Sequence, residues 1–188
     1  MEKRFASRAG EKLQFALEHF KLDVKNFICA DLGSDRGGFT DCLLKNGAKK
    51  IYAVEKGYGL LDWNLRNDSR VEVMERTNAL YAKLPEKVDI VTIDVGWTKQ
   101  GLIIPKALEM LKIDGKIVSL IKPQYEAKKN QIRKGKVIEE FLPEILKKVQ
   151  KDIGCGEKLD CRIIKSPIIG KRGENIEYLA LVEFLKAV

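Results

Sequence analysis

Short apolar runs alternate with segments of helical spacing along most of the chain. Apolar positions between residues 7 and 20 follow a helical repeat, with Ser7 as a candidate N-cap. Residues 27–32 form an apolar run that enters a glycine-rich turn, and residues 39–45 again have helical spacing. The alternation continues, which predicts strands at 51–55, 71–75, 88–94, 116–122, 159–165 and 176–184, and helices at 60–66, 102–111 and 137–151.

This order of elements predicts an α/β fold with helices on both faces of a mostly parallel sheet. Right-handed crossovers then bring the carboxyl ends of the parallel strands to one rim, where open α/β sheets bind ligands. The connector at residues 166–174 contains a proline and two glycines, which is typical of a long hairpin loop. If the sixth strand is parallel to the others, the seventh therefore runs back. No repeat or linker divides the sequence, so residues 1–188 are expected to form one domain.

The turn after the first predicted strand reads D-x-G-x-x-x-G-G and opens a helix. Glycines let the backbone approach a ligand, and a helix N-terminus offers free N–H groups. A carboxylate at the end of the next strand can accept hydrogen bonds from ribose hydroxyls. The glycine spacing disfavours a pyrophosphate dinucleotide and favours S-adenosylmethionine, although the turn alone is also compatible with glycines that serve geometry only. The candidate cofactor-binding residues are Asp31, Gly33, Ser34, Gly37, Gly38, Glu55, Asn78 and Asp94.

Asn78 follows the third predicted strand, where its amide could bind an adenine edge or cap a helix. Asp94 and Lys122 end the fourth and fifth predicted strands, and Glu177 begins the seventh, so all three should reach the ligand rim. Lys12, on the first helix, can close over them. Three of them have an ordinary structural alternative: Lys12 as a solvated helix residue, Glu177 as an exposed edge residue and Asp94 as a strand cap.

Two lysines and two carboxylates at one rim form a coupled network. A lysine beside another cation in a partly desolvated site loses its proton more easily and can act as a general base. This gives Lys122 a role, because a ribose 2′-hydroxyl becomes a good nucleophile when its proton is accepted.

Composition and charge add a preference for an anionic partner. The chain has 35 Lys and Arg against 27 Asp and Glu, a formal charge of +8, which suits nucleic acid or another polyanion. The 4 cysteines form no C-x-x-C pair and only 1 histidine is present, so we expect reduced thiols, no disulfide framework and no metal site. No signal peptide or membrane span is recognisable, which predicts a cytoplasmic protein without a membrane partner.

Seven segments resemble the FtsJ-like ribosomal RNA 2′-O-methyltransferases, and within them the hemolysin A (TlyA) branch: SRAGEKL, GGFTDCLL, GAKKIYAVEKGYG, ERTNA, IDVGW, KPQYEA and SPIIG with NIEYL. They lie in order over nearly the whole chain. The resemblance implies a Rossmann-like class I methyltransferase fold, a seven-stranded sheet with an antiparallel last strand, S-adenosylmethionine as cofactor, and ribosomal RNA or a ribosomal subunit as partner. It also implies a catalytic Lys-Asp-Lys-Glu tetrad, which falls on Lys12, Asp94, Lys122 and Glu177.

The chain differs from this family at three places. Ser34, Asp35 and Arg36 replace small residues of the cofactor turn, and Gly96 and Trp97 follow Asp94 where serine and phenylalanine are usual. The branch commonly has an RNA-binding domain ahead of the enzyme, whereas this sequence starts at the catalytic domain, so RNA capture is expected to depend on the chain's own surface or on a partner. A basic segment after the proposed base is the candidate RNA-binding cluster, with a solvated loop as the alternative: Lys128, Lys129, Arg133, Lys134 and Lys136.

The favoured hypothesis is therefore an S-adenosylmethionine-dependent rRNA 2′-O-methyltransferase. Two alternatives stay open: a catalytically silent RNA-binding or ribosome-assembly protein with the same fold, and a nucleotide-dependent oxidoreductase. The sequence leaves the methylated nucleotide and the oligomeric state undetermined.

Overall fold

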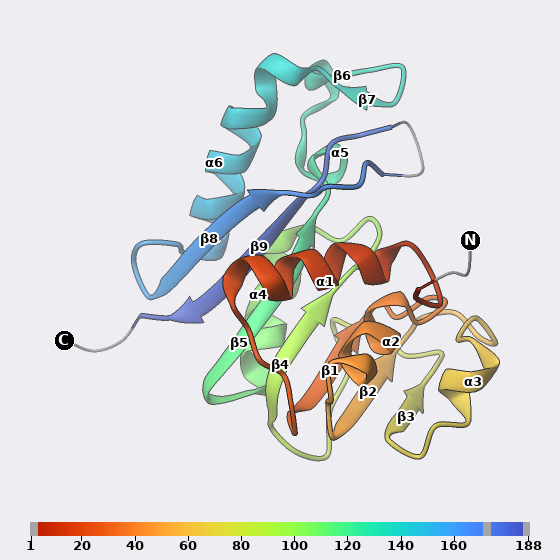
Figure 1. The fold of residues 1–188 in the computed structure, drawn as a ribbon. Helices are drawn as coiled ribbons and strands as arrows, with labels where there is room; N and C mark the ends of the chain where they lie inside the picture. The colour runs from red at the N-terminus through yellow and green to blue at the C-terminus, as the bar shows by residue number, and fades with distance from the viewer. Residues whose placement is uncertain (1–3, 171–173, 186–188) are drawn as a thin grey trace.

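Seven strands form one sheet in the order β3-β2-β1-β4-β5-β9-β8 in the computed structural model, which describes residues 4–170 and 174–185 (Figure 1). β1 to β5 pair in parallel, whereas β9 is antiparallel to both β5 and β8. The predicted α/β class and the reversed last strand are confirmed. The strand bounds are β1 (Ile28–Leu32), β2 (Lys50–Val54), β3 (Val71–Met74), β4 (Val88–Ile93), β5 (Leu111–Ile121), β8 (Leu159–Lys165) and β9 (Tyr178–Phe184).

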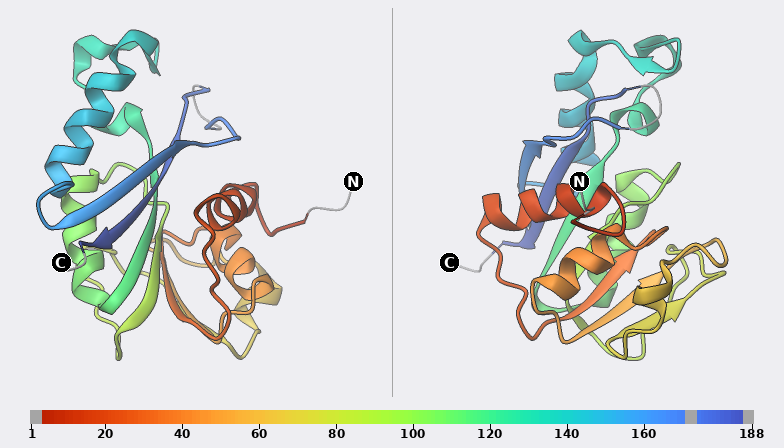
Figure 2. Two further views of the ribbon diagram at one scale, coloured as in Figure 1. Left: turned by 60° about the vertical axis from the view of Figure 1, so that its left-hand side comes forward. Right: turned by 45° about the vertical axis from the view of Figure 1, so that its right-hand side comes forward.

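Helices cover both faces of the sheet (Figure 2). One apolar core lies between the sheet and α1 and α2, and a second lies between the sheet and α4 and α6. Neighbouring residues of a strand serve opposite cores: Cys29 belongs to the first and Ala30 to the second, and Ile51 and Tyr52 divide in the same way. Burial on both faces explains why these strands read as continuous apolar runs. The helix bounds are α1 (Ala9–Phe20), α2 (Gly38–Lys45), α3 (Trp63–Arg66), α4 (Gln100–Met110), α5 (Pro123–Glu126) and α6 (Leu142–Ile153).

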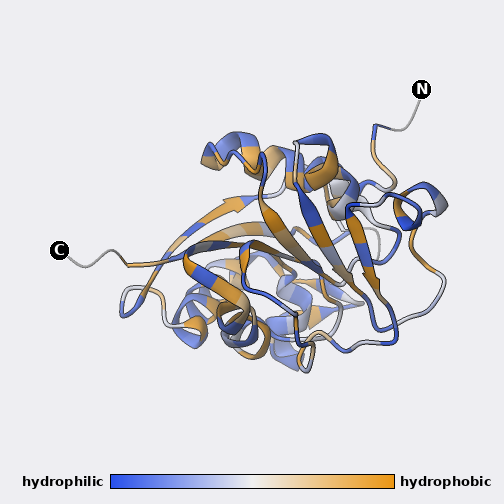
Figure 3. Cartoon of the chain, turned by 90° about the horizontal axis from the view of Figure 1, so that it is seen from below, coloured by the Kyte–Doolittle hydropathy of each residue, from blue (hydrophilic) through white to orange (hydrophobic). Residues whose placement is uncertain are grey.

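Apolar residues gather along the central strands in Figure 3, where the sheet is seen between its helices. Both α1 and α6 present apolar residues to the cores and polar residues outward. Fully burying one Ile or Leu side chain contributes about 1.5–3 kcal/mol, so these faces supply much of the stabilisation that fixes the sheet rim.

Helix boundaries differ from the predictions at several ends. α1 begins at Ala9, and Ser7 accepts a hydrogen bond from the Ala9 N–H without being the N-cap. α6 begins at Leu142 rather than at residue 137, because Pro143 fits only the first turn of a helix. The preceding segment instead forms a small hairpin, β6 (Ile132–Arg133) and β7 (Lys136–Val137), flanked by the short helices η1 (Lys129–Gln131) and η2 (Glu139–Phe141).

The prediction that all cysteines are reduced is wrong for two of them. Cys155 and Cys161 form a disulfide with a Cα–Cα distance of 5.6 Å. Gly154 ends α6 in a left-handed conformation, and the chain then turns back so that Cys155 pairs with Leu159 beside β8. The sequence spacing does not reveal this reversal. Cys29 and Cys42 are buried free thiols, and burial raises the pKa of Cys42 to about 12.

In the part of the chain that the structure describes, no helix has the length and apolar character needed to cross a bilayer.

Candidate active site

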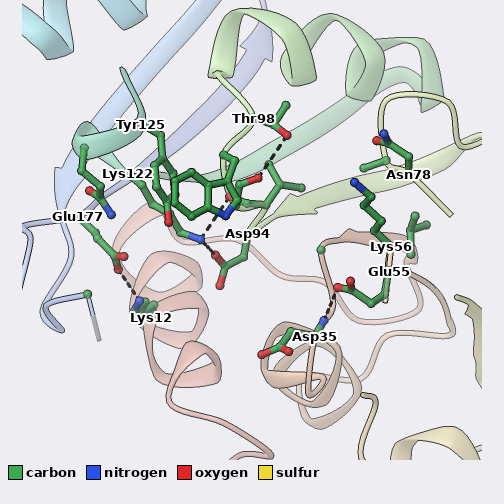
Figure 4. Close-up of a pocket in the computed structure, with 18 of the residues that line it drawn as sticks. Lys12, Asp35, Glu55, Lys56, Asn78, Asp94, Thr98, Lys122, Tyr125 and Glu177 are labelled. Atoms are coloured by element: carbon green, nitrogen blue, oxygen red, sulfur yellow. Dashed lines mark hydrogen bonds and ion pairs between the residues drawn. The ribbon is translucent and has the colours of Figure 1, made fainter. Parts of the chain in front are cut away.

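A pocket of about 560 Å³ lies at the carboxyl ends of the parallel strands, as the topology predicts. Its lining comes from α1, the β1–α2 turn, the end of β2, the segments after β2, β3, β4 and β5, and the segment before β9 (Figure 4). All four predicted tetrad residues line it: Lys12, Asp94, Lys122 and Glu177. The described residues contain no group of three or more His, Cys, Asp or Glu side chains suited to a metal ion.

Lys12 and Glu177 form a buried ion pair on one side of the pocket. Their side chains are only 11% and 5% exposed. α1 carries Lys12 across the sheet to the point where β9 begins. Gly170 passes so close that an added Cβ would lie 2.8 Å from Glu177 Oε1, so this loop and the carboxylate are packed together.

Lys122 and Asp94 form the second ion pair, with 2.5 Å between Nζ and Oδ1. Lys122 follows β5 and precedes Pro123, the first residue of α5, so the strand must end there. The ammonium also donates a hydrogen bond to the Val95 carbonyl at 3.3 Å. Asp94 follows β4, and the pair therefore joins the ends of two adjacent strands.

Glu55 occupies the other end of the pocket, where backbone groups hold its carboxylate. The Asp35 N–H donates to Oε2 at 3.0 Å and the Gly57 N–H donates to Oε1 at 2.7 Å. Each oxygen keeps a lone pair for a ligand hydroxyl. Gly33 is close by, with φ of +85°, and an added Cβ would lie 2.8 Å from the Asp94 carbonyl oxygen. Glycine therefore allows the turn to lie directly against the end of β4.

Four predicted cofactor residues do not line the pocket: Asp31, Ser34, Gly37 and Gly38. Gly37 packs against Leu65, and Gly38 packs against Ser7, so both glycines serve close packing. Asp31 is completely buried and accepts hydrogen bonds from Thr40 Oγ1 at 2.7 Å and Thr92 Oγ1 at 3.0 Å. Burial raises the pKa of Asp31 to about 7, against the opposing effect of these hydrogen bonds. A direct cofactor role for these four residues stays a prediction.

Asn78 lines the pocket in a turn rather than at a helix start. Its Oδ1 accepts from the Leu80 N–H at 3.0 Å, which fixes the side chain and leaves the amide nitrogen for a ligand.

Sequence reasoning missed Lys56, Gln124 and Tyr125 as pocket residues. The Tyr125 ring stacks on Trp97 with centroids 4.9 Å apart, and Trp97 has a left-handed φ of +64°. Tyr125 lies beside Lys122 in Figure 4, so the aromatic pair forms a wall of the pocket next to this lysine. Position was the available signal, because Gln124 and Tyr125 directly follow a strand end that was already assigned to the site.

The predicted RNA-binding cluster lies apart from the pocket lining, on the β6–β7 hairpin and the segment before it. Its five side chains are exposed. Lys134 and Gly135 form the two-residue turn, both with positive φ, which suits a tight hairpin. Asn175 joins this hairpin to the segment before β9, since Oδ1 accepts from the Val137 N–H and Nδ2 donates to the Gly135 carbonyl.

Comparison with known proteins gives consistent results. A family model described as FtsJ-like methyltransferase matches residues 5–184. Hemolysin A of Brachyspira hyodysenteriae is 44% identical over 187 residues, which cover 94% of this chain and 76% of that protein. The 16S/23S rRNA (cytidine-2′-O)-methyltransferase TlyA of Mycobacterium tuberculosis is 41% identical over 141 residues, covering 73% of this chain and 52% of that protein.

Among solved structures, a hemolysin-like protein of Streptococcus thermophilus is similar over the whole chain. The TM-score is 0.92 at 37% identity, and the match covers 100% of this chain and 70% of that one. The chain thus spans between about half and three quarters of these three proteins.

Proposed function

Because the chain belongs to the FtsJ-like methyltransferase family, we propose that it transfers a methyl group from S-adenosylmethionine to a ribose 2′-oxygen of ribosomal RNA. One observation carries this proposal: four elements far apart in the sequence bring Lys12, Asp94, Lys122 and Glu177 to one pocket as two ion pairs. The M. tuberculosis relative, a 16S/23S rRNA (cytidine-2′-O)-methyltransferase, supports the same reaction, with cytidine as the nucleotide.

The residues present fit the cofactor. Glu55 offers a fixed carboxylate for ribose hydroxyls, Asn78 offers an amide nitrogen for an adenine acceptor, and Gly33 leaves room beside the backbone. When bound, S-adenosylmethionine supplies a sulfonium-activated methyl group. Asp35 adds a carboxylate to the same lining, which suits the positive charge of the sulfonium and amino groups.

In its neutral amine form, Lys122 accepts the proton from the 2′-hydroxyl as the new oxygen–carbon bond forms and the bond between the methyl group and the sulfonium sulfur breaks. The end of β5 sets the position of the Lys122 side chain, and Asp94 orients its Nζ atom through their direct contact. Lys12 and Glu177 hold the ribose or its phosphate in line, which supplies catalysis through orientation. Trp97 and Tyr125 provide an aromatic wall on which an unstacked base can lie.

In this proposal, RNA phosphates bind to the β6–β7 hairpin, which carries Arg133, Lys134 and Lys136 of the predicted RNA-binding cluster. For single-stranded RNA, a plot of the logarithm of the binding constant against the logarithm of the salt concentration has a slope of about −0.7 for each phosphate that the protein neutralises. Replacing Lys134 and Lys136 by alanine is expected to reduce this slope. An unchanged slope would exclude the hairpin from RNA binding.

The test is transfer of labelled methyl from S-adenosylmethionine to ribosomal subunits and isolated ribosomal RNA. Wild-type protein should give a label that resists alkaline cleavage at one ribose. Lys122→Ala should lower the rate by at least about a hundredfold, the contribution of a positioned base, with unchanged cofactor affinity. Glu55→Ala should instead weaken cofactor binding.

A matched control is Lys112→Ala, because Lys112 lies on the same strand and forms an ion pair with Asp89 outside the pocket. It should keep full activity. Full activity in Lys122→Ala would disprove the base assignment.

A second candidate, RNA binding without catalysis, is favoured by the bulky cation Arg36 in the cofactor turn, where its charge opposes that of the sulfonium. RNA binding without measurable affinity for S-adenosylmethionine would establish it.

A further inference from the structure

Two segments carry the Lys122 end of the pocket, one after β4 and one after β5, and they contact each other at successive points. Asp94 pairs with Lys122. Further along both segments, Trp97 stacks on Tyr125 with ring centroids 4.9 Å apart. Both segments lie beyond the ends of their strands, so their relative position depends on such contacts rather than on the sheet.

Neither segment is expected to be rigid by itself. The segment after β5 forms α5, a helix of 4 residues, which is too short to be stable alone. In the segment after β4, Trp97 is 77% exposed and has a left-handed φ of +64°, which is unfavourable for a bulky residue. A strained backbone persists only when the surrounding structure determines it. The two segments therefore need a fixed point.

A buried carboxylate supplies this fixed point. Glu126 ends α5 and is only 4% exposed, and its Oε1 atom accepts a hydrogen bond from the Gln100 N–H at 2.7 Å. Gln100 is the first residue of α4, and the N-cap residue before it, Lys99, gives this helix no side-chain cap among the described residues. Glu126 thus caps α4 from another element, where the positive end of the helix dipole favours a carboxylate.

The start of α4 is itself attached to the sheet. Gln100 accepts a hydrogen bond from Ser119 Oγ at 2.6 Å, and its Nε2 atom donates to the Leu120 carbonyl at 3.4 Å. Both partners lie on β5, so contacts lead from this strand through Gln100 to Glu126. Burial raises the pKa of Glu126 despite the opposing effect of the Gln100 N–H, so the fold keeps an ionisable group where its charge is disfavoured.

We propose that Glu126 is a positioning residue for methyl transfer, which holds Trp97 and Tyr125 together by joining α5 to the start of α4. This inference rests on the proposed function. Tyr125 directly precedes Glu126 in the sequence. Trp97 lies three residues before Gln100, so loss of the hydrogen bond between the two helices frees both aromatic rings. The target base then loses its fixed wall, and its ribose loses its alignment with Lys122.

The first test is the mobility of the Trp97 backbone N–H, measured by 15N NMR relaxation of the full chain. The wild type should give an order parameter of about 0.85, the value of rigid backbone, and Glu126→Ala should lower it below about 0.6. Glu126→Gln should keep the wild-type value, because its amide oxygen can still accept from the Gln100 N–H. These measurements do not depend on methyl transfer.

The second test is methyl transfer to ribosomal RNA. Glu126→Ala should lower kcat/KM for RNA about ten- to a hundredfold through lost alignment, and Glu126→Gln should restore it. The affinity for S-adenosylhomocysteine should stay unchanged, because the Glu55 end of the pocket is built from other segments. Asp89→Ala is the matched control, since Asp89 also accepts from a backbone N–H, that of Ile28 at 2.8 Å, but lies outside the pocket. It should keep wild-type mobility at Trp97 and wild-type activity.

A wild-type order parameter below about 0.6 at Trp97, an unchanged value in Glu126→Ala, or an equal loss in Glu126→Gln or Asp89→Ala would overturn the proposal. If Glu126→Ala fails to fold, Glu126→Asp takes its place, because it withdraws the carboxylate by one methylene group. It should lower the order parameter in the same direction, and no change would overturn the proposal. Absent methyl transfer in the wild type, with the order parameters as expected, would disprove the proposed function alone.

Discussion

The two ends of the pocket are held together in different ways. Around Glu55, backbone N–H groups and a glycine turn form the site, and the Asp35–Glu55 hydrogen bond joins residues 20 positions apart. Around Lys122, ionised side chains meet across separate elements, and the Lys12–Glu177 pair joins residues 165 positions apart. The Glu55 end depends on local turns, whereas the Lys122 end is assembled only when α1, β4, β5 and β9 have packed.

This difference has an energetic consequence. At the Glu55 end, two backbone N–H groups donate to a partly exposed carboxylate, so loss of one donor leaves a charge that water can still solvate. The Lys12–Glu177 pair is desolvated, so removal of one partner leaves a charge buried without compensation. The Lys122 end should therefore be the more sensitive to single substitutions.

Lys12→Met gives the largest expected effect. It should lower the free energy of unfolding by about 3–5 kcal/mol, because the carboxylate of Glu177 stays buried without its cation. The double variant Lys12→Met/Glu177→Gln should recover much of this loss, since no charge remains to be buried. Urea denaturation of both variants and the wild type measures the difference.

Lys148→Met is the control for that comparison. Lys148 also forms an ion pair, with Asp152 on α6, but these side chains are 40% and 37% exposed. Its loss should cost less than about 1 kcal/mol. Equal costs for Lys12→Met and Lys148→Met would show that burial does not make the Lys12–Glu177 pair more costly to break than an exposed pair.

The sequence was informative about the Lys122 end for a topological reason. Polar residues at the ends of apolar strands had to meet at one rim, and Asp94, Lys122 and Glu177 do so. The bounds of β8, 159–165, were also predicted correctly, since turn residues flank a segment in which apolar and polar residues largely alternate.

The glycine turn was harder to interpret, because a turn motif does not specify which side chains point into the site. Gly37 and Gly38 face packed side chains instead of the pocket. The Cys155–Cys161 disulfide was missed because it depends on a local chain reversal.

Asp31, buried beneath the glycine turn, should make stability depend on pH. Its pKa rises from an ordinary value of 3.8 to about 7, so the folded state binds the proton more tightly than the unfolded state. Stability should therefore fall as the pH rises from 4 to 7 and then level off, by roughly 4 kcal/mol in all.

Asp31→Asn keeps hydrogen-bonding groups for Thr40 and Thr92 and cannot ionise. Its stability relative to the wild type should increase with pH over the same window, as measured by denaturation at pH 5, 6, 7 and 8. A stability difference that stays constant from pH 5 to pH 8 would show that Asp31 is ionised in the fold throughout.

Gly33→Ala should give a smaller loss that sharpens the contrast between the two ends. Gly33 and Gly156 have nearly the same backbone, with φ of +85° and +84°, but only at Gly33 would the new Cβ meet a neighbour, the Asp94 carbonyl oxygen at 2.8 Å. Alanine should cost about 1–2 kcal/mol at either position for the left-handed conformation. The additional loss of stability in Gly33→Ala measures the contact with the Asp94 carbonyl. That contact links the turn to the proposed catalytic residue, so Gly33→Ala should also reduce methyl transfer, whereas Gly156→Ala should not. Equal losses of stability and activity in the two variants would mean that the Glu55 end and the Lys122 end of the pocket are not coupled through this turn.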